Sequence, residues 1–149
     1  MDIEVSQSVR IKDAQDTVPA FSNHLSWAIL LPANVKRAAE RHLKQRYRKP
    51  RNPELKIFAA GLYLLLRHHL SMQLIITIDQ EWPGAANEAT IKALLLAHVR
   101  VALPDFPKSH IRFARIGKGS RAHKKAYAVH RERQKAGYVV TEEAILELL

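Results

Sequence analysis

Residues 74–84, LIITIDQEWPG, join a short apolar β-branched run to two carboxylates. The run 74–78 is short for a helix and a Pro-Gly pair stops it, so it predicts a buried strand. Side chains alternate along a strand, which places Asp79 and Glu81 on the same face at its carboxyl end. In open α/β sheets, ligands bind beyond that end. The stretch therefore predicts an α/β fold with a candidate site at the mouth of the sheet.

Two acids at a strand exit are notable in a chain whose formal net charge is +10, because they predict a bound cation. Hard divalent ions such as Mg²⁺ or Mn²⁺ need only a few carboxylates when the substrate supplies phosphates. Asp13, just past the first expected strand, is a third acid near the same mouth. We take Asp79, Glu81 and Asp13 as candidate metal ligands. The alternative is a solvated strand end whose acids cap the next helix.

Length and composition predict one domain over residues 1–149. The chain has no cysteine, which excludes disulfides, thiolate zinc sites and cysteine nucleophiles. Its first residues are acidic and polar, so no export signal is visible. The longest apolar stretch, 57–66, is about half the roughly twenty residues of a membrane span. We expect a cytoplasmic protein without a membrane segment.

Positive charge gathers in two segments. Residues 36–51 hold eight Lys or Arg against Glu40 alone, and residues 108–135 hold ten against Glu132 alone. Concentrated positive charge is typical of proteins that bind a phosphate backbone. We therefore expect DNA or RNA as the partner. An acidic protein or an anionic membrane surface fits the charge less well.

The first basic segment predicts a helix at about 35–49, with Asn34 as its cap. One stripe of this helix is apolar, and another carries four cations one turn apart: Arg37, Arg41, Lys44 and Arg48. Like charges at this spacing repel each other. Phosphates lying against the row would relieve that repulsion, whereas the alternative is a solvated helix face.

The second basic segment predicts a strand, turn and helix at about 110–136. Ser120 would cap the helix, and the turn amides would form an anion site whose side chains are Lys118, Ser120, Arg121, Lys124 and Lys125. The glycine spacing of nucleotide triphosphatases and dinucleotide enzymes is absent. His123, Tyr127 and His130 lie at helical spacing, so their rings could stack on bases. The alternative is an ordinary strand-to-helix turn.

Other patterns complete the outline of the chain. We expect strands at 4–12, 25–31 and 139–140, with a loop at 13–23 between the first two. Helices are expected from Asn52-Pro53 through 66, from a cap at Asn87 to about 103, and after Thr141. Together these elements predict a mixed central sheet flanked by helices.

This order of elements resembles the ribonuclease H-like superfamily, at the level of topology and over most of the chain. The resemblance implies a catalytic acid on the first strand, another at the end of a central strand, and an acid or a histidine near the last helix. Those roles would fall to Asp13, Asp79 and His123. The chain departs from the pattern because Asp13 lies past its strand, no third meander strand precedes the first helix, and Glu132 is the only acid of the basic last helix.

The leading hypothesis is a divalent-metal-dependent nuclease that hydrolyses phosphodiester bonds, with Asp79 as its main ligand and Asp13 or Glu81 as the partner. One alternative is a non-catalytic DNA- or RNA-binding module or a subunit of a nucleoprotein complex. Another is a basic scaffold that docks an acidic protein. A nuclease and a binding module differ in whether substituting Asp79 abolishes cleavage while leaving binding intact.

Overall fold

The computed structural model describes residues 2–8, 10–22, 26–49, 51–80, 84–117, 119–131 and 135–149. Two residues of the predicted sites, Glu81 and Lys118, lie outside these ranges.

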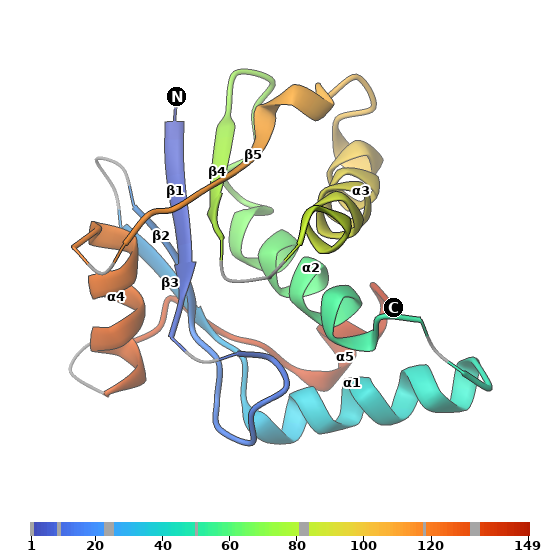
Figure 1. The fold of residues 1–149 in the computed structure, drawn as a ribbon. Helices are drawn as coiled ribbons and strands as arrows, with labels where there is room; N and C mark the ends of the chain where they lie inside the picture. Colours follow the sequence, from blue (N-terminus) through green and yellow to red (C-terminus); the bar gives the residue numbers. More distant parts are fainter. Residues whose placement is uncertain are drawn as a thin grey trace.

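A six-stranded mixed sheet forms the centre of the molecule, in the order β5-β4-β1-β2-β3-β6 (Figure 1). Strands β1, β2 and β3 are an antiparallel meander, while β4 runs parallel to β1, β5 parallel to β4, and β6 parallel to β3. The predicted α/β fold with a mixed sheet is confirmed. The strands are β1 (Asp2–Gln7), β2 (Pro19–Ser22), β3 (Ser26–Leu30), β4 (Ile75–Asp79), β5 (Ile111–Ala114) and β6 (Tyr138–Val139).

The meander corrects the expected loop at 13–23, because β2 lies inside it. All four residues of β2 are buried, since α2 contacts the strand as part of the main core and α4 packs on the sheet as well. A strand buried on both faces has no polar alternation to reveal it. Its Pro19 is tolerated because it is the first residue of the strand. The first strand also ends at Gln7, earlier than expected.

Helices cover the sheet on both sides (Figure 1). Helix α4 packs on β1, β2 and β3, while α2 packs on β2 and β3 and carries α1, α3 and α5 against it. The helices are α1 (Ala33–Arg46), α2 (Pro53–Leu66), α3 (Ala85–Ala102), α4 (Arg121–His130) and α5 (Glu142–Leu146), with a short 3-10 turn η1 (Lys108–His110) before β5.

Two apolar cores separate these layers. The larger core surrounds α2, which is buried on nearly every side, as its composition predicts. The smaller core lies under α4, where Ala126 and Val129 meet Val18, Ala20 and Ala28. Small side chains at that contact let α4 approach the sheet closely. Among the described residues, no helix is long and apolar enough to cross a membrane.

Two predicted helix caps are wrong. Helix α1 begins at Ala33, so Asn34 lies inside it, and the Ala33 amide donates to the Asp16 Oδ1 atom at 2.7 Å. Helix α3 begins at Ala85, which puts Asn87 in its first turn. In α1 the cap comes from a residue 17 positions away in sequence, which no local pattern reveals.

Three other predicted starts fit better. The Ser120 Oγ atom accepts from the amide of His123 at 3.0 Å, and the Thr141 hydroxyl accepts from Ala144 at 3.2 Å. Asn52 occupies the cap position of α2 without a capping side-chain bond. The basic helix α4 is shorter than the predicted range, because it ends at His130.

Candidate nucleic-acid interface and sheet mouth

Asp79 is the last residue of β4, and its half-buried carboxylate is already engaged. Its Oδ1 atom accepts a 3.1 Å hydrogen bond from the amide of Ile116. The burial of β4 alternates as predicted, with Ile76 and Ile78 buried and Asp79 on the opposite face. Asp79 therefore ties the end of β4 to the segment that leads from β5 into α4.

The strand neighbour of Asp79 is a hydroxyl side chain. Val5 pairs with Ile78 in the parallel β1–β4 ladder, so the next residue, Ser6, lies beside Asp79. Ser6 is 3 % exposed, and in the described part of the chain its Oγ atom has no hydrogen-bond partner. The position on β1 nearest Asp79 thus carries no carboxylate.

Asp13 lies in the loop between β1 and β2, not on a strand. It is exposed and lines an open cavity of about 570 Å³ at the carboxyl ends of the strands, together with Arg10 and Gln80. Asp79 is not part of that lining and instead borders a space of about 10 Å³ with Ser6. The loop brings Asp13 to the mouth of the sheet without placing it against Asp79.

The predicted divalent metal site does not form from the residues that can be placed. Within the described ranges, no three His, Asp or Glu side chains are grouped so that they could hold a metal ion. Asp79, Asp13 and His123 are therefore not brought together as one centre. Glu81, the third predicted ligand, lies outside the described residues.

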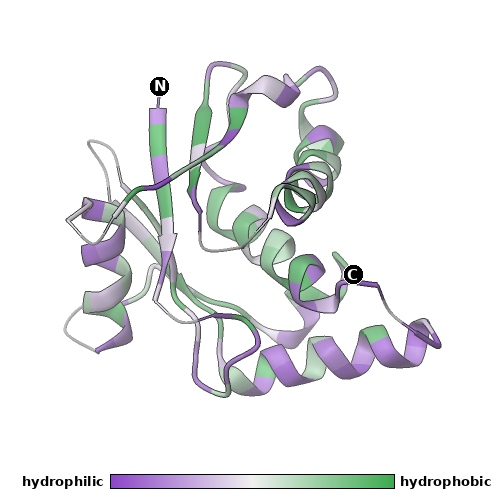
Figure 2. Cartoon of the chain, viewed as in Figure 1, coloured by the Kyte–Doolittle hydropathy of each residue, from purple (hydrophilic) through white to green (hydrophobic). Residues whose placement is uncertain are grey.

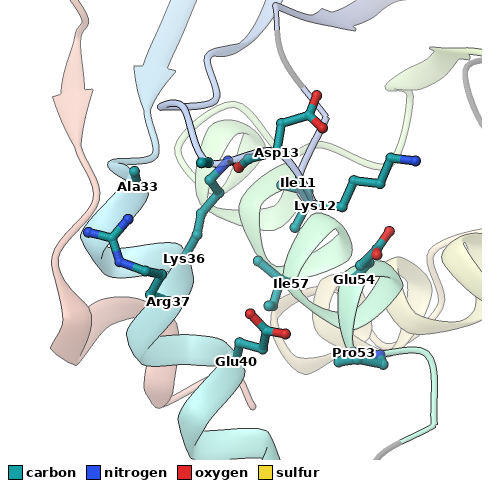
Figure 3. Close-up of a pocket in the computed structure, with 11 residues that line it drawn as sticks. Ile11, Lys12, Asp13, Ala33, Lys36, Arg37, Glu40, Pro53, Glu54 and Ile57 are labelled. Carbon is teal, nitrogen blue, oxygen red and sulfur yellow. Dashed lines mark hydrogen bonds between the residues drawn. The ribbon is translucent and has the colours of Figure 1, made fainter.

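Lys36 is a buried residue, although in the sequence it is the first of the eight cations of the basic segment 36–51. It is 5 % exposed, and its Nζ atom donates to the Asp13 carbonyl at 2.7 Å (Figure 3). The same atom donates to the Thr17 Oγ1 atom at 3.0 Å and to the Arg10 carbonyl at 3.5 Å. Burial lowers the pKa of Lys36, and the charges of Asp13 and Asp16 oppose that shift. Lys36 anchors the loop and is not part of a phosphate-binding surface.

The cavity beside Lys36 has mixed charge. Its volume is about 260 Å³, and Figure 3 shows Glu40 from α1 and Glu54 from α2 facing it across from the loop. Arg37 lines the same cavity. Positive charge is thus partly balanced at the first turns of α1 and dominates farther along the helix.

The α1 basic surface comprises Arg37, Arg41 and Lys44 of α1 and Arg48 just beyond it, and all four side chains are exposed as predicted. The helix ends at Arg46 and not at about residue 49, because the chain turns to an extended conformation at Tyr47, so Arg48 does not continue the helical row. The opposite stripe of the helix is buried, and Figure 2 shows α1 as largely hydrophilic along its outer side. Lys44 pairs with Glu40 at 3.4 Å, and an exposed pair of this kind adds little stability. The other three cations have no carboxylate within ion-pair distance in the described part of the chain.

The α4 basic surface lies on the other layer. Ala126 and Val129 pack on the sheet and Ala122 is also buried, while Arg121, Lys124 and Tyr127 are exposed. Tyr127 is 44 % exposed, and the Arg131 guanidinium lies over its ring at 5.0 Å. The surface comprises Arg121, Lys124, Lys125, Tyr127 and Arg131. We did not single out Arg131 from sequence, although its i, i+4 spacing from Tyr127 was a usable signal.

The predicted anion site at the turn before α4 loses part of its donor set. The Ser120 hydroxyl serves as the helix cap, and the Ile116 amide is bound to Asp79. Gly117 has a φ of 80°, the left-handed conformation that glycine allows. For anion binding, the side-chain cations of α4 are therefore more important than the main-chain amides of the turn.

The loop 10–16 lies between the two basic surfaces. It shares the cavity near Lys36 with α1, and it shares another cavity, of about 410 Å³, with Val129 and His130 of α4. Arg10 and Lys12 are exposed on this loop. Sequence patterns gave no reason to select these two cations, because their position depends on the fold.

No protein-family model, curated protein or solved structure matches this chain.

Proposed function

We propose that this protein binds nucleic acid through the α1 and α4 basic surfaces. The observation that carries the proposal is the set of exposed guanidinium groups on α1 and just past its end. Arg37 and Arg41 lie on the outer side of α1, and Arg48 follows just past the end of the helix at Arg46. None of these three cations has a carboxylate partner among the described residues. Like charges one turn apart, such as those of Arg37 and Arg41, repel each other, and a bound anion would relieve that repulsion. A nucleic-acid backbone carries a line of negatively charged phosphates, which could neutralise these arginines.

The α4 surface adds a second kind of contact. An exposed aromatic ring among cations can stack on a base or a sugar while the cations contact phosphates. Tyr127 has this setting, with Arg131 on its ring and Lys124 exposed nearby on the same helix. The loop 10–16, which carries the exposed cations Arg10 and Lys12, lines one cavity with α1 and another with α4. These features support one binding region that includes both helices.

Binding is tested by fluorescence anisotropy with labelled single-stranded and duplex DNA and RNA. The test variant carries Arg37→Gln, Arg41→Gln and Arg48→Gln. Losing three phosphate contacts should weaken binding by at least about tenfold, and by similar factors across sequences. Equal affinity of the variant and the wild type would reject the α1 surface.

A matched control removes the same charge from another face. Lys92→Gln, Lys108→Gln and Arg112→Gln alter the groove between α3 and β5, away from the loop that joins the two basic surfaces. This triple variant should keep the wild-type affinity. If both triple variants lose affinity equally, net charge and not the α1 surface determines binding.

A second candidate function is metal-dependent phosphodiester hydrolysis of the ribonuclease H-like type. Asp79 favours it, because this carboxylate lies at the carboxyl end of a strand with a parallel neighbour on each side. The three-strand meander before α1, which the sequence did not reveal, also supports the resemblance. The Ser6 hydroxyl beside Asp79 and the bond from Ile116 count against it.

Two substitutions of Asp79 separate its chemical role from its structural one. Asp79→Asn removes the charge but keeps an oxygen that can accept from the Ile116 amide, whereas Asp79→Ala removes both. A nuclease would cleave in Mg²⁺ or Mn²⁺ and lose cleavage in Asp79→Asn with binding intact. Absence of cleavage by the wild type on single-stranded, duplex, hybrid and branched substrates would reject hydrolysis.

A further inference from the structure

A groove between α3 and β5 lies apart from both basic surfaces. It has a volume of about 450 Å³ and is lined by three cations, Lys92, Lys108 and Arg112. Its single acid, Glu88, accepts a 3.1 Å hydrogen bond from the Gln80 side chain. The groove therefore has an excess of positive charge.

One wall of this groove is the edge of the sheet. Strand β5 is the last in the sheet order, and no strand of the described chain pairs with its outer side. The Ala114 carbonyl accepts from the Gln80 amide, and the Ile116 amide donates to Asp79, so these residues face β4. Main-chain groups alternate along a strand, which turns those of Phe113 outward, and Arg115 follows directly after the end of β5. An exposed edge of this kind is a template for another strand.

The floor of the groove is apolar. Ile111 is buried and Phe113 is half-buried, while Ala89 of α3 forms part of the opposite wall. A strand laid along β5 would place one set of side chains on Phe113, on the side of α3, and the alternate set on the side of Arg112. Strand addition works in this way, since main-chain bonds give affinity and alternate side chains give specificity.

We propose that β5 binds an extended acidic peptide segment of a partner protein as an added strand. The acidic side chains face Arg112, the apolar ones pack on Phe113, and the peptide main chain pairs with Phe113 and Arg115. Lys92 and Lys108 add to the positive charge of the groove. Charge complementarity selects an acidic segment. Outward carbonyl groups favour a peptide over a nucleic acid, because a peptide has N–H donors and a phosphate backbone does not. This site goes beyond the proposed function and does not depend on it.

The probe is a labelled peptide of about six residues that alternates glutamate with valine. It is titrated into the ¹⁵N-labelled full chain. Amide shifts should concentrate at residues 111–115, and the amide protons of Phe113 and Arg115 should become protected from exchange. Shifts confined to α1 or α4, or no binding at all, would overturn the proposal.

Two controls separate strand addition from plain charge attraction. The triple variant Lys92→Gln, Lys108→Gln and Arg112→Gln should weaken peptide binding about tenfold, as expected for loss of its main charged contacts. The α1 triple variant, which loses the same charge, should bind the peptide like the wild type. A peptide methylated on alternate backbone nitrogens should not bind, and equal binding of the methylated peptide would exclude β-strand pairing.

A nucleic acid at this groove is the competing outcome. An unlabelled single-stranded oligonucleotide of about 16 nucleotides is added to the peptide complex. It should leave the shifts at residues 111–115 in place. Displacement of the peptide from these residues, with the α1 surface unaffected, would assign the groove to nucleic acid and overturn the peptide proposal.

Discussion

The Lys36 ammonium group donates a 2.7 Å hydrogen bond to the main-chain carbonyl oxygen of Asp13. It also donates to the hydroxyl of Thr17, so one buried cation holds both ends of the turn that follows β1. The charge is satisfied by neutral oxygens, with the Asp13 carboxylate left exposed. This contact fixes the loop that lies between α1 and α4.

Replacing Lys36 by methionine should destabilise the fold. The substitution keeps the aliphatic stem but leaves the Asp13 carbonyl and the Thr17 hydroxyl without their donor. Leaving buried polar groups unpaired costs about 2 kcal/mol, which lowers Tm by roughly 4–8 °C in a chain of this size. Thermal unfolding followed by circular dichroism measures the shift. An unchanged Tm would show that the loop is not anchored through Lys36.

Asp16 should stabilise α1 from outside the helix. Asp16→Ala removes the acceptor of the Ala33 amide, and loss of a helix cap costs about 1 kcal/mol. Asp16→Asn keeps an acceptor oxygen and should lose much less. Urea denaturation of both variants compares the free energies of unfolding. Equal losses in the two variants would mean that the hydrogen bond is not the cause.

Gly137 lies directly under the indole of Trp27. A Cβ atom at this position would lie 2.4 Å from the Trp27 Cη2 atom, while the Gly137 amide donates to the Ala28 carbonyl at 2.8 Å. Gly137→Ala must therefore displace the ring or the β3–β6 pairing. We expect a loss of about 1–3 kcal/mol, the range for an overpacked site, in the free energy of unfolding.

The control for this clash is Gly119→Ala, where an added Cβ meets nothing within 4 Å. Its stability should stay within about 0.5 kcal/mol of the wild type. In a Trp27→Leu background, which removes the ring, Gly137→Ala should cost much less than in the wild type. A cost that is the same in both backgrounds would contradict the contact with the indole.

Acid should weaken the packing of α2 against α3. Burial lowers the pKa of His98, whose ring lies 5.6 Å from that of Tyr63. The unfolded chain therefore binds a proton more readily, and the free energy of unfolding falls as the pH drops below the ordinary histidine value of about 6.5. His69, whose pKa is also lowered by burial and by His68, acts in the same direction.

Urea titrations at about pH 7.5 and about pH 5.5 measure this dependence. His98→Gln should reduce the difference between the free energies of unfolding at these two pH values, whatever its effect on stability at pH 7.5. If the free energy of unfolding changes with pH as much in the variant as in the wild type, His98 does not contribute to the pH dependence.

Elements with a local signature were predictable from the sequence. The β-branched run of β4 and the continuous apolar surface of α2 each indicate a buried element. Ser120 caps the helix that directly follows it, so this cap is also visible in the local sequence. Strand β2 has no such signature, because Pro19 and Ser22 are typical of turns and both faces are buried. The α1 cap from Asp16 depends on chain segments that meet only in the fold.

The residues of the candidate site also differ in whether a local sequence pattern predicts their exposure. Exposed cations such as Arg37 and Lys124 were predictable, since helical periodicity separates them from the apolar stripe. Lys36 was counted with them, yet it is buried, because the loop after β1 folds over it and supplies oxygens. The sequence likewise could not show that Ser6 and not Asp13 is the neighbour of Asp79, because this follows from the β1–β4 register.

The most direct test of nucleic-acid binding through α1 is the salt dependence of the affinity. The logarithm of the binding constant for duplex DNA is measured against the logarithm of the salt concentration, for the wild type and for the Arg37→Gln, Arg41→Gln, Arg48→Gln variant. Each lost phosphate contact should reduce the slope by about one, so the variant should lose about three, while the groove variant at Lys92, Lys108 and Arg112 keeps the wild-type slope. An α1 variant with the wild-type slope would contradict the account.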